Sequence, residues 1–300
     1  MSLQYIRANG IDLAYDEFGE PGQPVILLIM GLGTQMIAWP AVFCEGLAAR
    51  GYRVIRFDNR DIGLSQKMES AAVPHVLRLL AHSRLRLPLS VPYTLEDMAK
   101  DAIGLLDALD IKAAHVVGAS MGGMIAQLMA GHYPYRVLSL TSIMSTSGCR
   151  SLPGADPRVS MHMVRRPTNP DVEALEDYSM RTWRLIGSPA YPPSDEALLE
   201  KIRASYQRSY YPAGYRRHMA AIMASGDRVA LLKKVIAPTL VIHGNDDPLV
   251  PVAAGIDTAR HVRGARLEVI DGMGHDLPQP LLGHFVELIS SHATEALSAN

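Results

Sequence analysis

The sequence predicts an α/β protein built on a doubly wound, mostly parallel sheet, and three observations support this class. Short apolar runs rich in Val, Ile and Leu alternate with longer helix-forming stretches along most of the chain. The length of 300 residues and the apolar content of 48% suffice for a sizeable core. A strand-like run, a glycine-rich turn and a helix-forming run also follow one another around Ser120.

The first elements predict the edge and the centre of this sheet. Alternating runs at 4–8 and 11–18 flank Asn9-Gly10, which is a strong hairpin signal, so we expect two antiparallel strands at one sheet edge. The continuous apolar run 25–30 is typical of a central strand buried on both faces. Further strands are expected at 52–57, 115–118, 137–143, 238–243 and 266–270, and helices at 39–50, 94–109, 124–130, 252–262 and 280–297.

Residues 145–232 interrupt the alternation of strands and helices. This segment is rich in Pro, Arg, Tyr and Met, and its patterns predict helices near 172–186, 195–209 and 215–224 without a strand. We therefore expect one catalytic domain of the α/β class, made of residues 1–144 and 233–300. A helical cap, or lid, is expected as an insertion at 145–232.

Composition argues against several classes of function. The 29 Lys and Arg residues balance 30 Asp and Glu residues, so no strong field favours nucleic acid or an anionic membrane. The N-terminus lacks the apolar core of a signal peptide, and no run approaches the ~18 apolar residues of a membrane span. A cytoplasmic location is expected. Cys44 and Cys149 are interpreted as free thiols.

Gly118-Ala-Ser120-Met-Gly122 has the pattern of a nucleophile elbow. In such a turn the serine takes a strained backbone conformation that projects its hydroxyl, and a Cβ at either flanking position would collide with the neighbouring strand or helix. The pattern lies between a predicted strand and a predicted helix, as the elbow requires. Ser120 is therefore the candidate nucleophile.

A serine hydroxyl needs a base, and the base needs an orienting group. His275 follows the predicted strand 266–270, and Asp247 follows the predicted strand 238–243. Parallel strands place such loops at one sheet edge, where ligands of open α/β sheets bind. We predict His275 as the base and Asp247 as its partner. Asp246, Asp271 and Asp276 remain alternatives to Asp247.

An acyl-transfer site also needs donors for the developing oxyanion. The backbone N–H of Met121 is predicted as one donor, because it lies at the start of the helix after Ser120. The loop after the first buried parallel strand commonly supplies the second donor. That loop is Met30-Gly31-Leu32-Gly33, in which we choose the N–H of Leu32.

The remaining histidines, the paired arginines and the methionines of the cap indicate a function less clearly. His115, His132 and His243 show no metal-ligand spacing and are expected to be structural. The paired arginines Arg165-Arg166 and Arg216-Arg217 are interpreted as solvated charge. Methionines of the cap are expected mainly in its core, with an adaptable substrate pocket as the alternative; they are Met161, Met163, Met180, Met219 and Met223.

With these motifs in hand, the chain resembles the α/β-hydrolase superfamily over nearly its whole length. The matching stretches are Gly118-Ala-Ser120-Met-Gly122-Gly123, Phe57-Asp58-Asn-Arg60-Asp61-Ile-Gly63-Leu-Ser65, His243-Gly-Asn-Asp-Asp247-Pro and Gly272-Met-Gly-His275. The second and fourth resemble the aclacinomycin methylesterase branch of capped esterases. Met30-Gly31 stands where many members have His-Gly. The resemblance implies a Ser-His-Asp esterase with a helical lid and no cofactor.

The sequence thus predicts a carboxylesterase-type serine hydrolase acting on small to medium, largely apolar esters. Lactone, thioester or C–C bond hydrolysis and perhydrolysis could use the same three residues, so they remain open. A ligand-binding protein built on a hydrolase fold is the non-enzymatic alternative. Neither the substrate nor the oligomeric state follows from the sequence.

Overall fold

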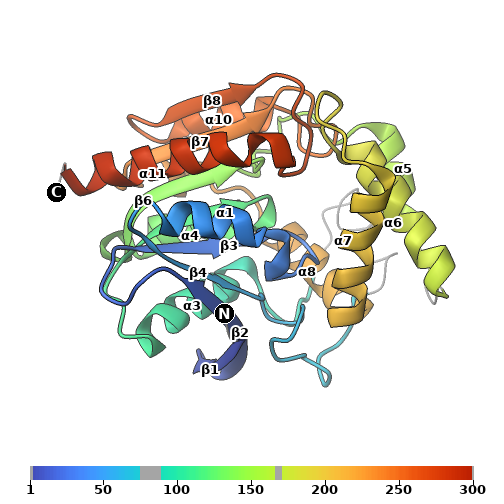
Figure 1. Cartoon of the computed structure of the whole chain (residues 1–300), viewed down its shortest axis with the longest axis horizontal. Coiled ribbons are helices and arrows are strands. Elements are labelled where there is room, and N and C mark those ends of the chain that lie inside the picture. Colours follow the sequence, from blue (N-terminus) through green and yellow to red (C-terminus); the bar gives the residue numbers. More distant parts are fainter. Residues whose placement is uncertain (1–2, 75–88, 166–170, 299–300) are drawn as a thin grey trace.

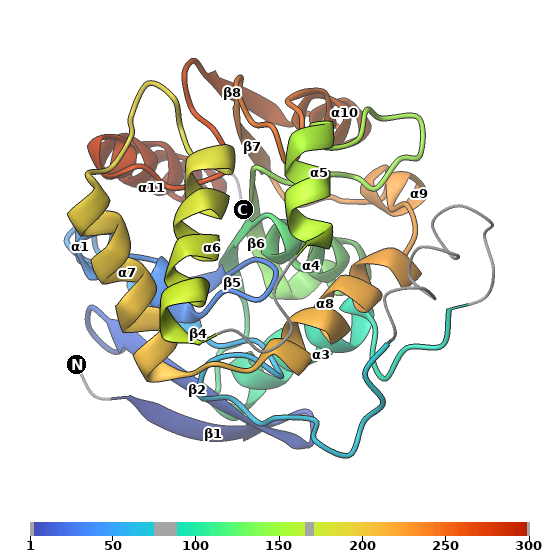
Figure 2. The ribbon, with the colours of Figure 1, turned by 90° about the vertical axis from the view of Figure 1, so that its right-hand side faces the viewer.

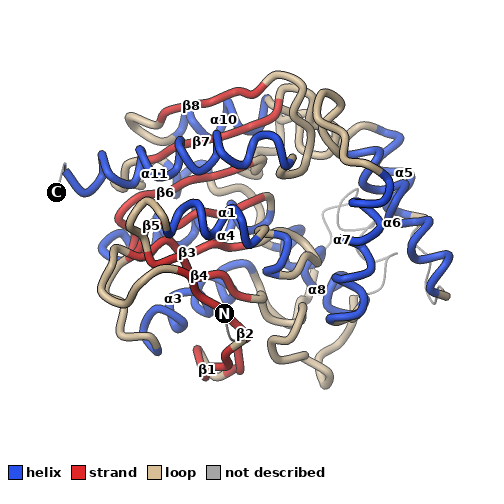
Figure 3. Tube along the Cα trace, viewed as in Figure 1, coloured by secondary structure: helices blue, strands red, loops and turns tan. Residues whose placement is uncertain are grey.

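Eight strands form a single sheet in the described part of the chain, in the order β1-β2-β4-β3-β5-β6-β7-β8 (Figures 1 and 3). The computed structural model describes residues 3–74, 89–165 and 171–298. Strands β1 and β2 pair antiparallel at one edge, β2 pairs antiparallel with β4, and all later pairs are parallel. The strands are β1 Gln4–Ala8, β2 Ile11–Phe18, β3 Val25–Ile29, β4 Arg53–Phe57, β5 Ala114–Ala119, β6 Val137–Ile143, β7 Thr239–Gly244 and β8 Arg266–Ile270.

Helices cover both faces of the sheet and enclose two apolar layers. One layer packs α1 (Ala41–Ala48) and α11 (Leu282–Ser298) against the strands, and the other packs α3 (Leu95–Ala108) and α4 (Met121–His132). Figure 1 shows α1 and α11 in front of the sheet. The remaining α-helices are α5 Pro157–Val164, α6 Val172–Ile186, α7 Asp195–Arg208, α8 Pro212–Ala224, α9 Val229–Leu232 and α10 Ala253–His261, and short 3₁₀ turns occupy Met36–Ala38, Pro134–Arg136 and Gln279–Leu281. The predicted doubly wound α/β class is confirmed.

Local chemistry explains where these elements begin and turn. Asn9 and Gly10 both have positive φ, at 46° and 78°, as a tight hairpin turn requires. Thr94 caps α3 through a capping box: its Oγ1 accepts the N–H of Asp97, and the Asp97 carboxylate accepts the N–H of Thr94. Every residue of β3 and of β5 is buried. The unbroken apolar sequence of β3 is typical of such a central strand.

The structure differs from the prediction mainly in helix boundaries. Helix α4 begins at Met121, directly after Ser120, rather than at Met124, because its glycines are accommodated by close packing against the sheet. Helix α8 begins at Pro212, since proline suits the first turn of a helix. Helices α5 and α9 were not predicted from the sequence; they span eight and four residues, too few for a clear periodic pattern.

Helices α5 to α8 lie together on the side of the sheet where the parallel strands end. Figure 1 shows these helices beyond the strand ends, and Figure 2 shows α5, α6 and α7 from the front, crossing the sheet. This places chain from the interval 145–232 over the edge that carries Ser120. No helix among the described residues has the length and apolar character needed to cross a membrane.

Candidate active site

Ser120 occupies a strained turn between β5 and α4. Its φ of 56° and ψ of −119° lie outside the usual regions for a residue with a side chain. A Cβ on Gly122 would overlap the carbonyl oxygen of Ile29 on the neighbouring strand, and a Cβ on Gly118 would overlap the backbone of Gly122. The glycines thus let helix and sheet approach closely enough to hold this turn. Ser120 is half-buried.

The structure brings His275 and Asp247 to the same point as Ser120. The Ser120 Oγ lies 3.0 Å from Nε2 of His275, and Nδ1 of His275 lies 2.7 Å from Oδ2 of Asp247. With the Nδ1–H donated to Asp247, Nε2 is free to accept the serine proton. Oδ1 of Asp247 accepts the N–H groups of Leu249 and Val250 at 2.9 and 2.8 Å. These bonds fix the carboxylate in the orientation that faces the imidazole.

The alternative acids occupy other positions. Asp246 accepts the N–H of Gly272 at 2.9 Å, and Asp271 contributes its carbonyl oxygen to the hydroxyl of Tyr191 at 3.4 Å. Asp276 accepts a short hydrogen bond from the hydroxyl of Ser188. Burial raises the pKa of Asp276. Of the four candidates, Asp247 is the one hydrogen-bonded to the His275 ring in the described structure.

His243 lies closer to the site than its expected structural role implied. Its Nε2–H donates to the carbonyl oxygen of Val250 at 2.7 Å and lies 3.6 Å from Oδ2 of Asp247. Burial lowers its pKa, which keeps the ring neutral beside the carboxylate. His243 therefore packs behind Asp247 as an uncharged neighbour. The described residues contain no group of three or more His, Cys, Asp or Glu side chains placed to hold a metal ion.

The loop that carries His275 is held by the last residue of α6 and by the loop that follows this helix. The N–H of His275 donates to the carbonyl oxygen of Ile186 at 2.6 Å, and the N–H of Gly274 donates to Oγ of Ser188 at 2.9 Å. Sequence reasoning missed Ile186 and Ser188, because a short loop after a helix shows no pattern that would reveal a role. Their contacts tie the segment between 145 and 232 to the imidazole-bearing loop.

The two proposed oxyanion donors flank Ser120. Met121 is the first residue of α4, so its N–H lies at the helix N-terminus. The loop after β3 also touches Ser120: a Cβ on Gly31 would lie 3.1 Å from Cβ and 3.5 Å from Oγ of Ser120. Leu32 follows in this loop and is partly buried. The backbone that carries the Leu32 amide is thus adjacent to the serine.

The loop after β4, whose motif carried the family resemblance, contains buried polar side chains with several hydrogen-bond and ionic partners. Asp58 accepts the N–H groups of Met36 and Leu64, both at 2.8 Å, and pairs with Arg208 of α7 at 2.7 Å. Arg60 pairs with Asp101 of α3 through two hydrogen bonds of 2.5 and 2.6 Å. The motif residues therefore bind both the sheet domain and a helix of the interval 145–232.

One of the arginines expected to be solvated is instead buried. Arg217 is 1% exposed, and its guanidinium lies 3.2 Å from Oδ1 of Asp61. Oδ2 of Asp61 accepts the hydroxyl proton of Tyr93 at 2.7 Å. The sequence showed only two adjacent arginines, and the partner of Arg217 is far away along the chain. Arg166 lies outside the described residues, and Arg165 is exposed as expected.

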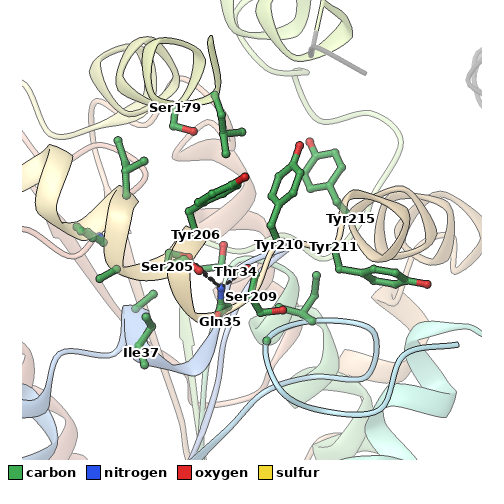
Figure 4. Close-up of a pocket in the computed structure, with 18 of the residues that line it drawn as sticks. Thr34, Gln35, Ile37, Ser179, Ser205, Tyr206, Ser209, Tyr210, Tyr211 and Tyr215 are labelled. Atoms are coloured by element: carbon green, nitrogen blue, oxygen red, sulfur yellow. Dashed lines mark hydrogen bonds between the residues drawn. The ribbon is translucent and has the colours of Figure 1, made fainter. Parts of the chain in front are cut away.

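A cavity of about 540 Å³ lies between α6, α7, α8 and the loop after β3. Figure 4 shows Tyr206, Tyr210 and Tyr215 around it, with Gln35 bonded to Ser205 and Ser209 below. Its wall is rich in aromatic rings, namely Trp183, Tyr206, Tyr210, Tyr211 and Tyr215. It reaches Gly33, next to Leu32, but Ser120 does not line it.

The methionines of the interval 145–232 are not fully buried, so the expectation that they lie mainly in a core is not met. None of Met161, Met163, Met180, Met219 and Met223 lines this cavity, and none is among the buried core residues. Met161 is 53% exposed, and the other four are half-buried. Helical spacing does not reveal which face of a cap helix is covered, and aromatic side chains form the cavity wall instead.

Comparison with known proteins agrees with this fold. Residues 24–166 match the family model described as the alpha/beta hydrolase fold. Rhodomycin D methylesterase DauP of Streptomyces sp. (strain C5) is 29% identical over 99% of both chains. 3-Oxoadipate enol-lactonase 1 of Acinetobacter baylyi is 25% identical over 90% of this chain and 89% of that enzyme.

A solved structure gives the same result for the three-dimensional fold. The enol-lactonase of Burkholderia xenovorans LB400 superposes with a TM-score of 0.74 at 23% identity, and covers 97% of this chain and 100% of its own. The eight-stranded sheet, its helical layers and the matched family model lead to one assignment. The chain has the α/β-hydrolase fold.

Proposed function

We propose that this α/β hydrolase is a serine esterase that cleaves carboxylic esters through Ser120, His275 and Asp247. The observation that carries the proposal is the continuous hydrogen-bonded line from Ser120 Oγ through the His275 ring to Asp247. The likeness to a methylesterase along 99% of both chains supports the same reaction class. Nothing in this mechanism requires a metal or an organic cofactor.

The chemistry follows from the atoms in this line. His275 Nε2 takes the proton of Ser120 as Oγ attacks the ester carbonyl, and the carbonyl oxygen becomes an oxyanion. The amides of Met121 and Leu32 stabilise this charge. His275 then returns the proton to the leaving alcohol, which leaves an acyl group on Ser120. A water molecule then attacks this acyl group while His275 takes a proton from the water. His275 gives that proton to Ser120 Oγ, which leaves as the acid is released. Throughout, Asp247 holds the required imidazole tautomer.

Replacement of the nucleophile tests the proposal directly. Hydrolysis of p-nitrophenyl butyrate is expected to fall at least about 10³-fold in a Ser120→Ala variant, and labelling by a fluorophosphonate should disappear. Ser160→Ala, which removes an exposed hydroxyl from α5, is the matched control and should behave as the wild type. Retention of full hydrolysis in Ser120→Ala would overturn the proposal.

We further propose that residues 145–232 act as a cap whose cavity accepts the part of the ester remote from the scissile bond. The cavity has room for a medium-sized organic group, and its wall ends at Gly33, beside the proposed oxyanion loop. Ser179 of α6 lines this cavity. A Ser179→Trp variant should raise KM for long or ring-containing esters while leaving acetate esters unaffected. Arg181→Trp, on the exposed side of the same helix, is the control.

Lactone hydrolysis is the second candidate function. The comparisons with two enol-lactonases favour it, because one covers 90% of this chain in sequence and the other 97% in structure. A lactone carbonyl presents the same electrophile to Ser120, so the same three residues would serve both reactions. A panel of acyl esters and lactones, run beside Ser120→Ala, ranks them by kcat/KM.

A further inference from the structure

His218, on helix α8, reaches from the cap segment into the loop beside Ser120. Its Nδ1 accepts the N–H of Gly33 at 3.3 Å, and its Nε2–H donates to the carbonyl oxygen of Arg60 at 2.8 Å. The ring is fully buried and meets the Tyr93 ring edge-on at 6.2 Å. One imidazole thus joins two loops of the sheet domain that lie far apart in the sequence.

The same loop is held on its other side by Asn59. The side-chain amide of Asn59 donates to the carbonyl oxygen of Met30 at 2.9 Å, and both groups are buried. Asn59 immediately precedes Arg60, whose carbonyl oxygen receives the His218 proton. The peptide that carries the Leu32 N–H therefore lies between two fixed points, Met30 O and Gly33 N.

These bonds also bear on which amide of the loop faces the serine. The N–H of Gly33 is engaged by His218, and the N–H of Thr34 donates to the carbonyl oxygen of Gly31 at 3.2 Å. Both amides that follow Leu32 are thus engaged within the protein. This distribution of partners favours Leu32 as the oxyanion donor of the loop.

Helix α8 is itself anchored firmly enough to serve as a reference for this loop. Gly214 lies so close to the Asp61 backbone that a Cβ there would overlap the Asp61 carbonyl oxygen. Arg217, next to His218, pairs with the buried carboxylate of Asp61 at 3.2 Å. Tyr215 packs on Gly33 as well, since a Cβ on that glycine would meet its ring. The position of α8 therefore sets the position of Gly33.

We propose that His218 is a positioning residue that places the Leu32 amide for transition-state stabilisation. The oxyanion site then depends on the position of helix α8. The inference rests on the proposed esterase function, because it assigns a role within that mechanism. Burial lowers the pKa of His218 to about 4. The ring therefore stays neutral at physiological pH, with one nitrogen able to accept from Gly33 and the other able to donate to Arg60.

Two amide substitutions separate the hydrogen bonds of His218. The amide of Asn can occupy the place of Nδ1, so His218→Asn keeps an acceptor for the Gly33 N–H. The longer Gln reaches the place of Nε2, so His218→Gln keeps the donor to Arg60 and loses the bond to Gly33. We expect kcat to fall about tenfold in the Gln variant, less than complete loss of an oxyanion donor, and less than about threefold in the Asn variant.

A transition-state analogue distinguishes positioning from general loosening. A trifluoromethyl ketone adds to Ser120 and forms an oxyanion, so its Ki should rise in the Gln variant by the same factor as kcat/KM falls. Rates are normalised to active sites titrated with a fluorophosphonate, and thermal unfolding reports folding. His292→Gln is the matched control, because His292 is also buried and also donates through Nε2 to a backbone oxygen, that of Pro238.

Equal losses in the Asn and Gln variants, or an unchanged Ki in the Gln variant, would show that the Gly33 bond does not position the donor. If the Gln variant fails to fold, Asn59→Leu releases the other side of the loop and must raise Ki in the same way for the proposal to stand. Hydrolysis at the wild-type rate by the Ser120→Ala variant would instead refute the serine mechanism itself. Failure of the His218 proposal is therefore distinguishable from failure of the proposed function.

Discussion

Asp247 binds the His275 ring through Oδ2 and two backbone amides through Oδ1, so both carboxylate oxygens are engaged. The carboxylate is buried, and the amides of Leu249 and Val250 keep it from rotating away from the imidazole. Asp247 therefore holds the ring in the tautomer that leaves Nε2 able to accept a proton.

Asp247→Asn should reduce kcat about 10³–10⁴-fold with little change in KM, because an amide NH₂ facing Nδ1 favours the wrong tautomer. Steady-state kinetics on a p-nitrophenyl ester measure the effect. Asp246→Asn is the control: it retains an acceptor for the Gly272 N–H and should stay within about threefold of the wild type. A comparable loss in both variants would argue against the assignment of Asp247.

Loss of Arg208 should destabilise the fold strongly. The Asp58 carboxylate is fully buried, and its ionic partner is Arg208 at 2.7 Å. Arg208→Leu leaves that charge without its cation, which is expected to cost about 3–5 kcal/mol of unfolding free energy in urea titrations. Arg203→Leu breaks the exposed pair with Glu176 and should cost less than about 1 kcal/mol. Similar costs for the two variants would contradict this reasoning.

Stability should fall as the pH drops from about 6.5 toward 4. Burial lowers the pKa of His115 to about 4, whereas the same group in the unfolded chain titrates near 6.5. Between pH 6.5 and pH 4 the His115 ring is mostly protonated in the unfolded chain and mostly neutral in the native chain. Lowering the pH therefore favours unfolding. From pH 7.5 to pH 5 this amounts to about 2 kcal/mol for one such histidine.

A non-titrating replacement checks the contribution of His115. His115→Asn can keep a polar partner for Ser139, whose hydroxyl lies 2.9 Å from Nδ1. Its urea midpoint should therefore change less between pH 7.5 and pH 5 than that of the wild type. His218 remains in both proteins and contributes the same slope to each. Identical pH slopes for the two proteins would show that His115 does not titrate as stated.

Two glycine-to-alanine changes should have opposite effects. Gly122→Ala places a Cβ against the carbonyl oxygen of Ile29, so the protein should lose its fold or its activity. Gly283 lies in the first turn of α11 with open space around it, and alanine there should stabilise the protein by about 0.5–1 kcal/mol. Thermal unfolding measures both. A destabilised Gly283→Ala variant would be the contrary result.

The sheet could be predicted because its signals are local. The buried strand β3 appears as an unbroken apolar run, and Asn9-Gly10 specifies the hairpin through backbone conformation alone. The interval 145–232 was less predictable. Its two short helices lack a full periodic pattern, and its contacts with the sheet domain join residues that are far apart in sequence, such as Arg217 and Asp61.

The sequence by itself determined the class of the fold, the elbow around Ser120 and the candidates that follow the last two strands. These depend on residue types at short spacing, where sterics and periodicity act within a few residues. Only the tertiary structure decided that Asp247, rather than Asp246, Asp271 or Asp276, faces His275, and that His218 reaches Gly33. Such choices depend on how separate loops dock, and docking is set by packing across the whole molecule.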